Sequence, residues 1–474
     1  MQKQKGSITI FSLLSLLLIT AFLFGLLEGT RFQELRRFAK LQTENAVESV
    51  FANYNTSLWK SYQLLGTSSN HINAILEIAA NGRSGEGTNF LRLVPIAISV
   101  TGDTRLTDGD GAVFVASVAA YMKENFAYEM AKEVYSQYEA INQLLEQNQM
   151  DLSSITEALN LQTTEQRART RGQDVWTILE EAAQWMKSGI LQLVIQDTNT
   201  LSEQKLDTTN DLFHRKRMTG INTVEYSANW SDRILLQQYL MTYLSSYSEK
   251  VQNRALSYEL EYLIGKKSND IENLNITAGK LLTIREAANF VYLLSNTACV
   301  AQAETMALLL VGVTANPVLV EIVKMGLLTA WALAESILDV RALMAGKRIA
   351  LLKSEETWTT ELENLSGLSD GFPMAKECNC GLTYQDYLGL LLLFEEEESL
   401  AMHSMNLQEA TIRKTDGDSS FGIDQLLTEL SVSITYSYEP VFPFLREIDA
   451  EERWERRLST SWEYGYYRKA GIKG

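Results

Sequence analysis

Hydrophobic residues open the chain in one continuous run, whereas later they recur with helical or strand periods. Residues 8–27 carry no charged side chain, and twenty residues of helix extend about 30 Å, the thickness of a bilayer core. A cleaved secretory signal would have a shorter apolar core followed by small residues at its cleavage site. Here the run leads into Glu28, Gly29 and Arg31 without such a site. The pattern favours a retained transmembrane helix over a cleaved signal or a buried core helix.

The expected membrane anchor follows a short polar flank, residues 1–7, and includes Ile8, Leu13, Leu17, Phe22 and Leu27. Its orientation is not fixed by charge. Basic residues stand on both sides of the run: Lys3 and Lys5 before it, and Arg31, Arg36, Arg37 and Lys40 after it. A literal count would hold the C-terminal side inside the cell, but long domains translocate with little regard to such counts. We expect a single-pass protein of the cell membrane with the bulk of the chain outside the cytoplasm.

Apolar residues at helical spacing continue beyond the membrane run. Ala46, Val47, Val50, Phe51 and Leu58 share one face of the predicted helix. No proline or glycine-rich turn interrupts this helix before Gly66. We therefore predict a stalk helix over residues 28–66, with its apolar face packed on a large domain over residues 67–474.

The large domain combines helical periods with a few strand periods. Residues 91–100 read as a strand, with Pro95 indicating an edge position, and a turn follows at residues 101–112. Helical spacing covers residues 115–145, 176–193 and 235–263, the last as two helices or one long one, and strands are expected at 431–438 and 459–467. The predicted class is α+β and predominantly helical, with a small antiparallel sheet that includes the C-terminal strands. The helical insertion covers about residues 112–410, and the C-terminal strands about residues 430–470.

A second apolar region, residues 306–320, is the other candidate for a membrane span. It is about 15 residues long, short of the roughly 20 required, and Asn316-Pro317 breaks it. The following helix contains Glu321, Lys324, Glu335, Asp339 and Arg341, which are expensive in lipid. A buried hairpin of core helices is favoured, and a second membrane element is the alternative.

Composition narrows the classes of function. The formal charge of −17 argues against nucleic-acid partners, because phosphate binding needs a basic surface, and against peripheral docking on anionic lipid. Three cysteines among 474 residues do not form a disulfide framework. The 46% of hydrophobic residues and 21% of charged residues are typical of a folded chain.

Motifs with a defined chemistry are missing from the sequence. There is no H-E-x-x-H pair for zinc and no G-x-S-x-G nucleophile elbow. We expect no catalytic residue, no metal or cofactor and no small-molecule ligand. Cys378 and Cys380 stay open as plain thiols, a local disulfide or metal ligands. The acidic stretches at 107–111 and 415–420 lack the full spacing of a calcium loop and are interpreted as turns, and Glu395 to Glu398 as a solvated helix face.

Several segments resemble known membrane proteins. "KGSITIFSLLSLLLITAFLFGLLEGTR" with "LQTENAVES" resembles the N-terminus of pseudopilins of tight-adherence (Tad) pilus systems. The segments "YELEYLIGKKSNDIENL", "IREAANFVYLL", "LLTAWALAESILDVRALMAGKRIALLKSEETW" and "LTYQDYLGLLLLF" are similar to an uncharacterised family of large membrane-anchored proteins from Gram-positive bacteria, often associated with such secretion genes. The resemblance implies a location and a context, but no chemistry.

The resemblance also raises a processing site at Gly6 and Ser7. A cut between them would place Phe11 fifth in the product, where type IV prepilins have Glu. Prepilin-peptidase processing and a plain polar flank therefore both stay open. The leading hypothesis is a non-enzymatic, pilin-like or accessory component of a Tad-type apparatus, with lipid and other subunits as partners. The rivals are a membrane-tethered enzyme or ligand-binding sensor of the cell envelope, and a cytoplasmic placement of the same domain.

Overall fold

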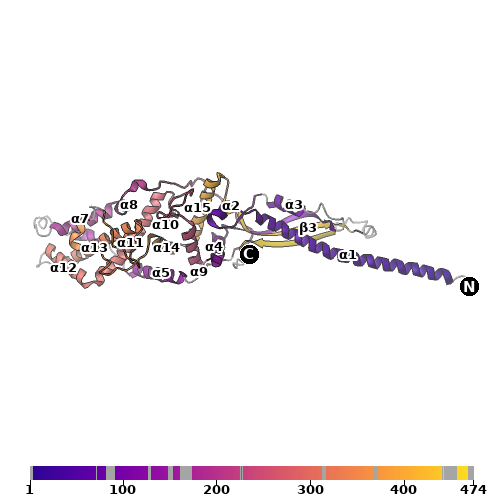
Figure 1. Ribbon diagram of the computed structural model, residues 1–474, viewed down its shortest axis with the longest axis horizontal. Helices are drawn as coiled ribbons and strands as arrows, with labels where there is room; N and C mark the ends of the chain where they lie inside the picture. The colour runs from indigo at the N-terminus through magenta and orange to yellow at the C-terminus, as the bar shows by residue number, and fades with distance from the viewer. Residues whose placement is uncertain are drawn as a thin grey trace. The chain divides into compact units, whose positions relative to one another are not determined.

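A computed structural model of the chain gives its helices and strands (Figure 1). It describes residues 4–70, 72–81, 91–125, 130–147, 153–160, 173–224, 226, 228–311, 317–367, 372–439, 441 and 456–467. The chain divides into two units, which are described separately below. The stalk unit comprises Met1–Ala120, Arg215–Ala228 and Ser420–Gly474, and the helical unit comprises Tyr121–His214 and Asn229–Ser419.

The stalk unit is a long helix with a small sheet. Its elements are α1 (Gln4–Ala52), α2 (Thr56–Tyr62), β1 (Thr67–Ser68), α3 (Ile72–Asn81), β2 (Val94–Arg105), the short 3-10 helix η4 (Ile423–Gln425), β3 (Leu426–Tyr438) and β4 (Arg456–Gly465). The helix α4 (Ala112–Asn125) contains the division after Ala120. In Figure 1 the first half of α1 projects alone beyond the sheet.

The sheet is built around β3, which pairs antiparallel with β1, β2 and β4. Among the described strands β2 pairs with β3 alone, so the edge position predicted from Pro95 is confirmed. The turn predicted over residues 101–112 is partly wrong, because β2 continues to Arg105. Pairing of Asp103 with Leu430 and of Arg105 with Leu427 extends the strand through residues that favour turns locally.

The predicted stalk helix is shorter than expected. It ends at Ala52 instead of Gly66. The side chain of Asn55 then accepts a hydrogen bond from the Leu58 amide at 2.7 Å and begins α2. An asparagine N-cap satisfies an amide that the helix itself leaves unpaired. The chain turns at this point without any proline or glycine.

The helical unit contains the remaining elements. They are α5 (Met130–Gln147), α6 (Ser153–Asn160), α7 (Gln173–Lys187), α8 (Ile190–Val194), η2 (Thr198–Thr200), α9 (Trp230–Tyr243), α10 (Glu259–Gly265), α11 (Asp270–Ser295), α12 (Thr297–Val311), α13 (Pro317–Met344), η3 (Leu362–Gly367), α14 (Tyr384–Phe394) and α15 (Glu397–Asp416). The predominantly helical α+β class, the long N-terminal helix and the small antiparallel sheet are thereby confirmed.

Two predicted helices are divided in the structure, and the region predicted as two helices or one long one forms two. Residues 115–145 form parts of α4 and α5, and residues 176–193 form α7 and α8, which meet at Gly189. Residues 235–263 form α9 and α10 with a long irregular segment between them. That segment is held by Glu259, whose carboxylate accepts hydrogen bonds from the amide and hydroxyl of Ser245 at 2.8 and 3.0 Å. Such tertiary contacts end a helix where periodicity alone does not.

Among the described residues two helices, α1 and α13, are long and apolar enough to cross a membrane by length and composition, and α11 with α12 passes the same test only as a pair bent by 87°. None of the most apolar window of α1 is buried, whereas 61% of the corresponding window of α13 is buried. In the helical unit α13 packs against α11, α12, α6 and α7. The core-hairpin interpretation of this region agrees with that burial.

Candidate functional site: the N-terminal helix and its sheet

The first half of α1 is an apolar rod with no protein around it in the described chain. Ile8, Leu13, Leu17, Phe22 and Leu27 are between 52% and 67% exposed. An apolar patch this continuous would be costly in water, so it needs lipid or other apolar helices around it. The finding supports membrane anchoring by this helix. Gly6 and Ser7 lie in its first two turns, at the end away from the sheet.

A buried arginine marks the point where α1 reaches the sheet. Arg31 is 2% exposed, and its guanidinium donates to Glu28 Oε1 at 2.7 Å and to the backbone oxygen of Glu439 at 2.9 Å. The ring of Phe32 lies 5.8 Å from that of Tyr438, one residue before Glu439. These contacts tie α1 to the end of β3 immediately after the apolar span. The charge of Arg31 is neutralised by Glu28.

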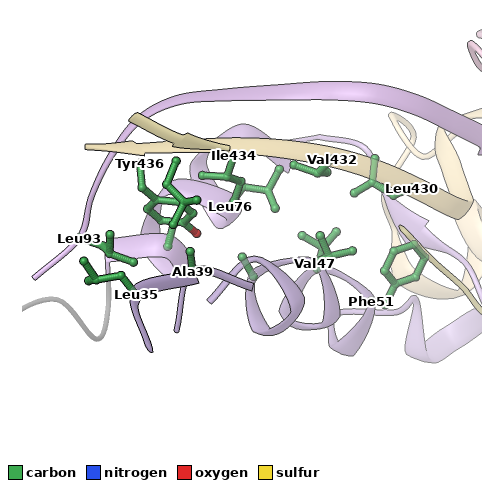
Figure 2. Packing of buried hydrophobic residues seen from close by; sticks show 14 residues of the cluster. Leu35, Ala39, Val47, Phe51, Leu76, Leu93, Leu430, Val432, Ile434 and Tyr436 are labelled. Carbon is green, nitrogen blue, oxygen red and sulfur yellow. The ribbon is translucent and has the colours of Figure 1, made fainter. Parts of the chain in front are cut away.

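The second half of α1 forms one wall of a hydrophobic core. Leu35, Ala39, Ala46, Val47, Val50 and Phe51 are fully or almost fully buried there. Figure 2 shows labelled members of this row facing Leu430, Val432, Ile434 and Tyr436 of β3, with Leu76 of α3 and Leu93 beside them. Buried faces with a period of 3.6 on the helix and of 2 on the strand therefore meet. The apolar stalk face predicted from sequence is confirmed.

Hydrogen bonds between α1 and the sheet accompany this apolar packing. The hydroxyl of Thr43 lies 3.2 Å from the hydroxyl of Tyr436 and 2.5 Å from that of Thr460. At the end of α1 the hydroxyl of Tyr466 donates to the backbone oxygen of Phe51. Hydrogen bonds in a buried setting fix the register of helix on sheet more sharply than apolar contacts do.

The helical unit contains a fully buried cluster of four charges. Asp339 of α13 forms ion pairs with the guanidinium of Arg285 at 2.9 Å and with the Lys353 ammonium group at 2.6 Å. Lys353 also binds Glu335, one turn earlier on α13. Two cations thus meet two carboxylates, and all four side chains are at most 1% exposed. Sequence analysis placed Glu335 and Asp339 on the helix but did not identify their partners.

The neighbouring groups complete this cluster. Glu335 accepts the amides of Thr359 and Thr360 at 3.0 and 2.9 Å, and the Arg285 guanidinium donates to the hydroxyl of Tyr387 at 2.9 Å. Buried charges are tolerated only when they are paired and hydrogen-bonded in this way. The cluster has the features of a structural centre: it is neutral in sum and closed to solvent.

A cleft of about 450 Å³ lies in the helical unit. Its polar lining includes Gln137, Gln237, Gln238, Gln385, Arg348 and Cys380. A Cβ at Gly389 would come within 2.4 Å of Gln237 Nε2, so the end of the Gln237 side chain would have to move to accommodate it. Cys378 and Cys380 are both free thiols. A hydrogen bond that the Cys380 thiol donates to Cys378 raises the pKa of Cys380 and so favours its protonated, less reactive form.

The other acidic positions have structural partners. In the predicted turn, Asp108 accepts the amides of Arg105 at 2.7 Å and Gly220 at 3.1 Å. At the second acidic turn α15 ends at Asp416, followed by Gly417 with φ of 67°. The solvated helix face predicted over Glu395 to Glu398 is wrong for Glu395, because that side chain is 12% exposed and binds Lys266 and Lys280, whereas Glu396 and Glu398 are exposed. Among the described residues, no group of three or more His, Cys, Asp or Glu side chains is placed to hold a metal ion.

One acid has a strongly perturbed titration. Burial raises the pKa of Glu261 to about 7, although the amide of Tyr247 and the hydroxyl of Tyr384 donate to it at 2.9 and 2.7 Å. A perturbed carboxyl is a feature of many active sites, but buried structural carboxyls share it. Glu261 does not line the cleft described above.

Comparison with known proteins gives one match. The model of a family of unknown function, DUF5702, matches residues 169–438, more than half of the chain. The chain belongs to the DUF5702 family. No curated protein and no solved structure matches it.

The DUF5702 match covers the helices from α7 to α15 together with β3, including the buried charge cluster and the lining of the cleft except for Gln137. It does not cover α1, β2 or β4. The expectation of an uncharacterised family is therefore confirmed. Of the expected anchor residues, all five lie on the exposed half of α1, outside the DUF5702 region.

Proposed function

We propose that this chain is a non-enzymatic, membrane-anchored, pilin-like or accessory component of a Tad-type pilus or secretion apparatus in the cell envelope of a Gram-positive bacterium. One observation carries the proposal. A single helix, α1, leaves a largely apolar stretch of 20 uncharged residues uncovered and then packs against a small antiparallel sheet. Subunits of this architecture assemble by packing their apolar halves side by side, while the remainder of the chain projects away. In this proposal the bulk of the chain lies outside the cytoplasm.

The composition of the apolar half supports close helix contact. Ser12, Ser15, Ala21 and Gly25 interrupt the larger side chains, and a Cβ added at Gly25 would meet nothing within 4 Å. Small residues let helix backbones approach closely in lipid, although these do not form a strict G-x-x-x-G pair. The tight attachment at Arg31 and Thr43 would transmit the position of each membrane helix to its sheet. A rigid junction of this kind suits a subunit whose membrane helices set the arrangement of the parts outside.

Cysteine crosslinking in native membranes tests the assembly. Single cysteines replace Leu13 or Leu17 in a full chain whose three native cysteines are serine, with a control cysteine at Lys187, an exposed position of the helical unit. We expect oxidation to give crosslinks to a second subunit or to another envelope protein at the helix positions and none at the control. A scan of residues 8–27 that yields no crosslink would refute lateral packing.

Two further measurements test placement and processing. Protease added to intact protoplasts should digest the helical unit, and survival of the whole domain would instead support the cytoplasmic alternative. Mass spectrometry of the N-terminal peptide distinguishes a product that begins at Ser7 from an intact polar flank. Both measurements use the native chain.

The cleft favours a second candidate, a membrane-tethered ligand-binding sensor. Its volume of about 450 Å³ lies in the range of small-molecule sites, and its glutamine side chains offer hydrogen-bond donors and acceptors to a small polar molecule. Alkylation of Cys380, which lines the cleft, provides the test. Protection of that thiol by a fraction of soluble envelope metabolites would favour the sensor, and unchanged alkylation would count against it.

A further inference from the structure

Basic side chains gather just beyond the apolar half of α1, where this helix reaches the sheet of the stalk unit, although the whole chain has a formal charge of −17. Arg36, Arg37 and Lys40 are exposed on α1, and Arg457 is exposed at the start of β4. Arg456 is half-buried beside Arg457. We call these five residues the basic collar. The net charge of the chain does not predict a local surface of this sign.

Two strand contacts give the position of the collar along α1. Arg456 pairs with Tyr438 in the sheet, and the Tyr438 ring lies 5.8 Å from that of Phe32. The start of β4 is therefore level with the turn of α1 that contains Arg31 and Phe32. At 1.5 Å per residue, this level is about 6–8 Å beyond Leu27, and Arg36 to Lys40 lie about 14–20 Å beyond it.

These distances match the structure of a bilayer. With the apolar run in the hydrocarbon core, the headgroup layer extends about 5–8 Å beyond Leu27. The start of β4 then lies at the headgroups. The exposed arginines of α1 lie about one Debye length of 8 Å further out, within reach of the phosphate layer through their long side chains. Phe32 and Tyr438 would occupy the interfacial position where aromatic residues concentrate.

The acidic groups near the collar are fewer than the basic ones. Residues 28–40, 439 and 456–457 contain six basic and three acidic residues. Of the acids, Glu28 is paired with buried Arg31, and Glu34 accepts from Arg37 at 3.3 Å. The Lys40 ammonium group lies 5.4 Å from the centre of the Trp462 ring, a cation–π contact that involves no acidic group. The described surface at this end of the stalk unit is therefore net positive.

We propose that the basic collar binds the headgroups of anionic phospholipids, and that this contact sets the depth of α1 in the bilayer and holds the end of the sheet against the membrane. The inference rests on the membrane placement of α1 but not on its assembly with other subunits. The partner is a lipid phosphate surface of negative charge, since five nearby cations match its charge density and adjoin the apolar span that brings them to it.

The test is native mass spectrometry of the full-length chain taken from nanodiscs with equal phosphatidylglycerol and phosphatidylcholine. The variant Arg36→Gln, Arg37→Gln, Arg457→Gln removes three collar charges. The matched control, Lys187→Gln, Lys205→Gln, Lys376→Gln, removes three exposed charges from the helical unit. Hydrogen exchange of β3 confirms that each variant is folded.

We expect the native chain to retain phosphatidylglycerol in excess. In the collar variant the ratio of retained phosphatidylglycerol to phosphatidylcholine should fall by about five-fold or more. Each basic residue near the surface contributes about five-fold before screening. The control should stay within about two-fold of the native chain, and 0.5 M salt should weaken the preference. A preference that persists unchanged in the collar variant, or equal losses in both variants, would refute the collar.

The segment between β3 and β4 supplies a distinct negative outcome. Residues 440–455 contain five acidic and two basic residues. If their charge dominated, the native chain would retain phosphatidylcholine in excess, and the proposal would be overturned. Failure of the crosslinks at Leu13 and Leu17 with a retained lipid preference would overturn only the assembly proposal, so the two results are separable.

Discussion

The attachment of α1 to the sheet is tested most sharply by two leucines of the same helix. Leu35 is fully buried in the core of the stalk unit, whereas Leu41 is 54% exposed. Figure 2 places Leu35 beside Leu93, under the end of β3 that carries Tyr436. The substitutions Leu35→Ala and Leu41→Ala remove the same atoms from the same helix. They therefore differ only in the contacts that the structure assigns to them.

The magnitude follows from burial. A Leu→Ala change in a core costs about 2–5 kcal/mol, from lost transfer free energy and from the cavity that remains. The core around Leu35 is closed by helix on one side and sheet on the other, which limits collapse into the cavity, so we expect about 3 kcal/mol. A surface change away from special contacts stays within about 0.5 kcal/mol. A loss of about 3 kcal/mol is a large share of the 5–15 kcal/mol that stabilises a typical domain.

Hydrogen exchange of the full chain in detergent measures the effect where it arises. The amides of β3 at Leu430, Val432 and Ile434 should exchange about 100-fold faster in Leu35→Ala, because about 3 kcal/mol corresponds to that factor when exchange follows unfolding of the stalk unit. In Leu41→Ala they should exchange as in the native chain. Equal rates in both variants would refute the docking of α1 on the sheet, and with it the rigid junction on which the proposed function depends.

Three further predictions concern the helical unit. Asp339→Asn should lower the free energy of unfolding of the helical unit in denaturant by about 3–5 kcal/mol, because two buried cations lose a partner. The control Glu321→Gln, at the exposed end of the same helix, should change it by less than about 0.5 kcal/mol. Gly381→Ala should destabilise the helical unit by about 1–3 kcal/mol, since the added Cβ would lie 2.5 Å from the backbone of Ile349. The control Gly29→Ala, whose Cβ would meet nothing within 4 Å, should leave thermal unfolding unchanged. The raised pKa of Glu261, about 7 against an ordinary 4.5, means that the folded state binds the proton more tightly. Stability should therefore fall by up to about 3 kcal/mol as pH rises from 4.5 to 7, and unfolding curves of Glu261→Gln should lack this component.

Periodic features of the fold could be predicted from the sequence. The apolar run of residues 8–27 and the buried face through Val47 and Phe51 both follow from spacing, because a helix that meets a sheet needs a stripe of apolar residues. The alternation around Ile434 likewise predicted β3. The end of α1 at Ala52 was not predicted, because an asparagine cap and a strand contact stop it without a glycine or proline.

Contacts between distant residues lay beyond sequence reasoning. Arg31 binds a backbone oxygen 408 residues later, and Arg285 binds Asp339 54 residues later. Nothing in the local pattern distinguishes these arginines from the exposed ones nearby. The i, i+4 spacing of Glu335 and Asp339 in the largely apolar second half of α13 was the available signal, since buried carboxylates require cations. Identifying those cations needs the fold.

The comparison of α1 with α13 shows what determines whether an apolar helix packs in the protein core or stays uncovered. Both pass the same test of length and hydropathy. The span of α1 has no charged side chain over residues 8–27, whereas α13 carries Glu335 and Asp339 at positions that only Arg285 and Lys353 neutralise. Moving α13 into lipid would separate these partners and leave carboxylates unpaired, at a cost that its apolar residues do not offset. Charge pairing thus accounts for the burial of α13 in the protein core, whereas α1 keeps the uncharged, uncovered surface that a membrane span requires.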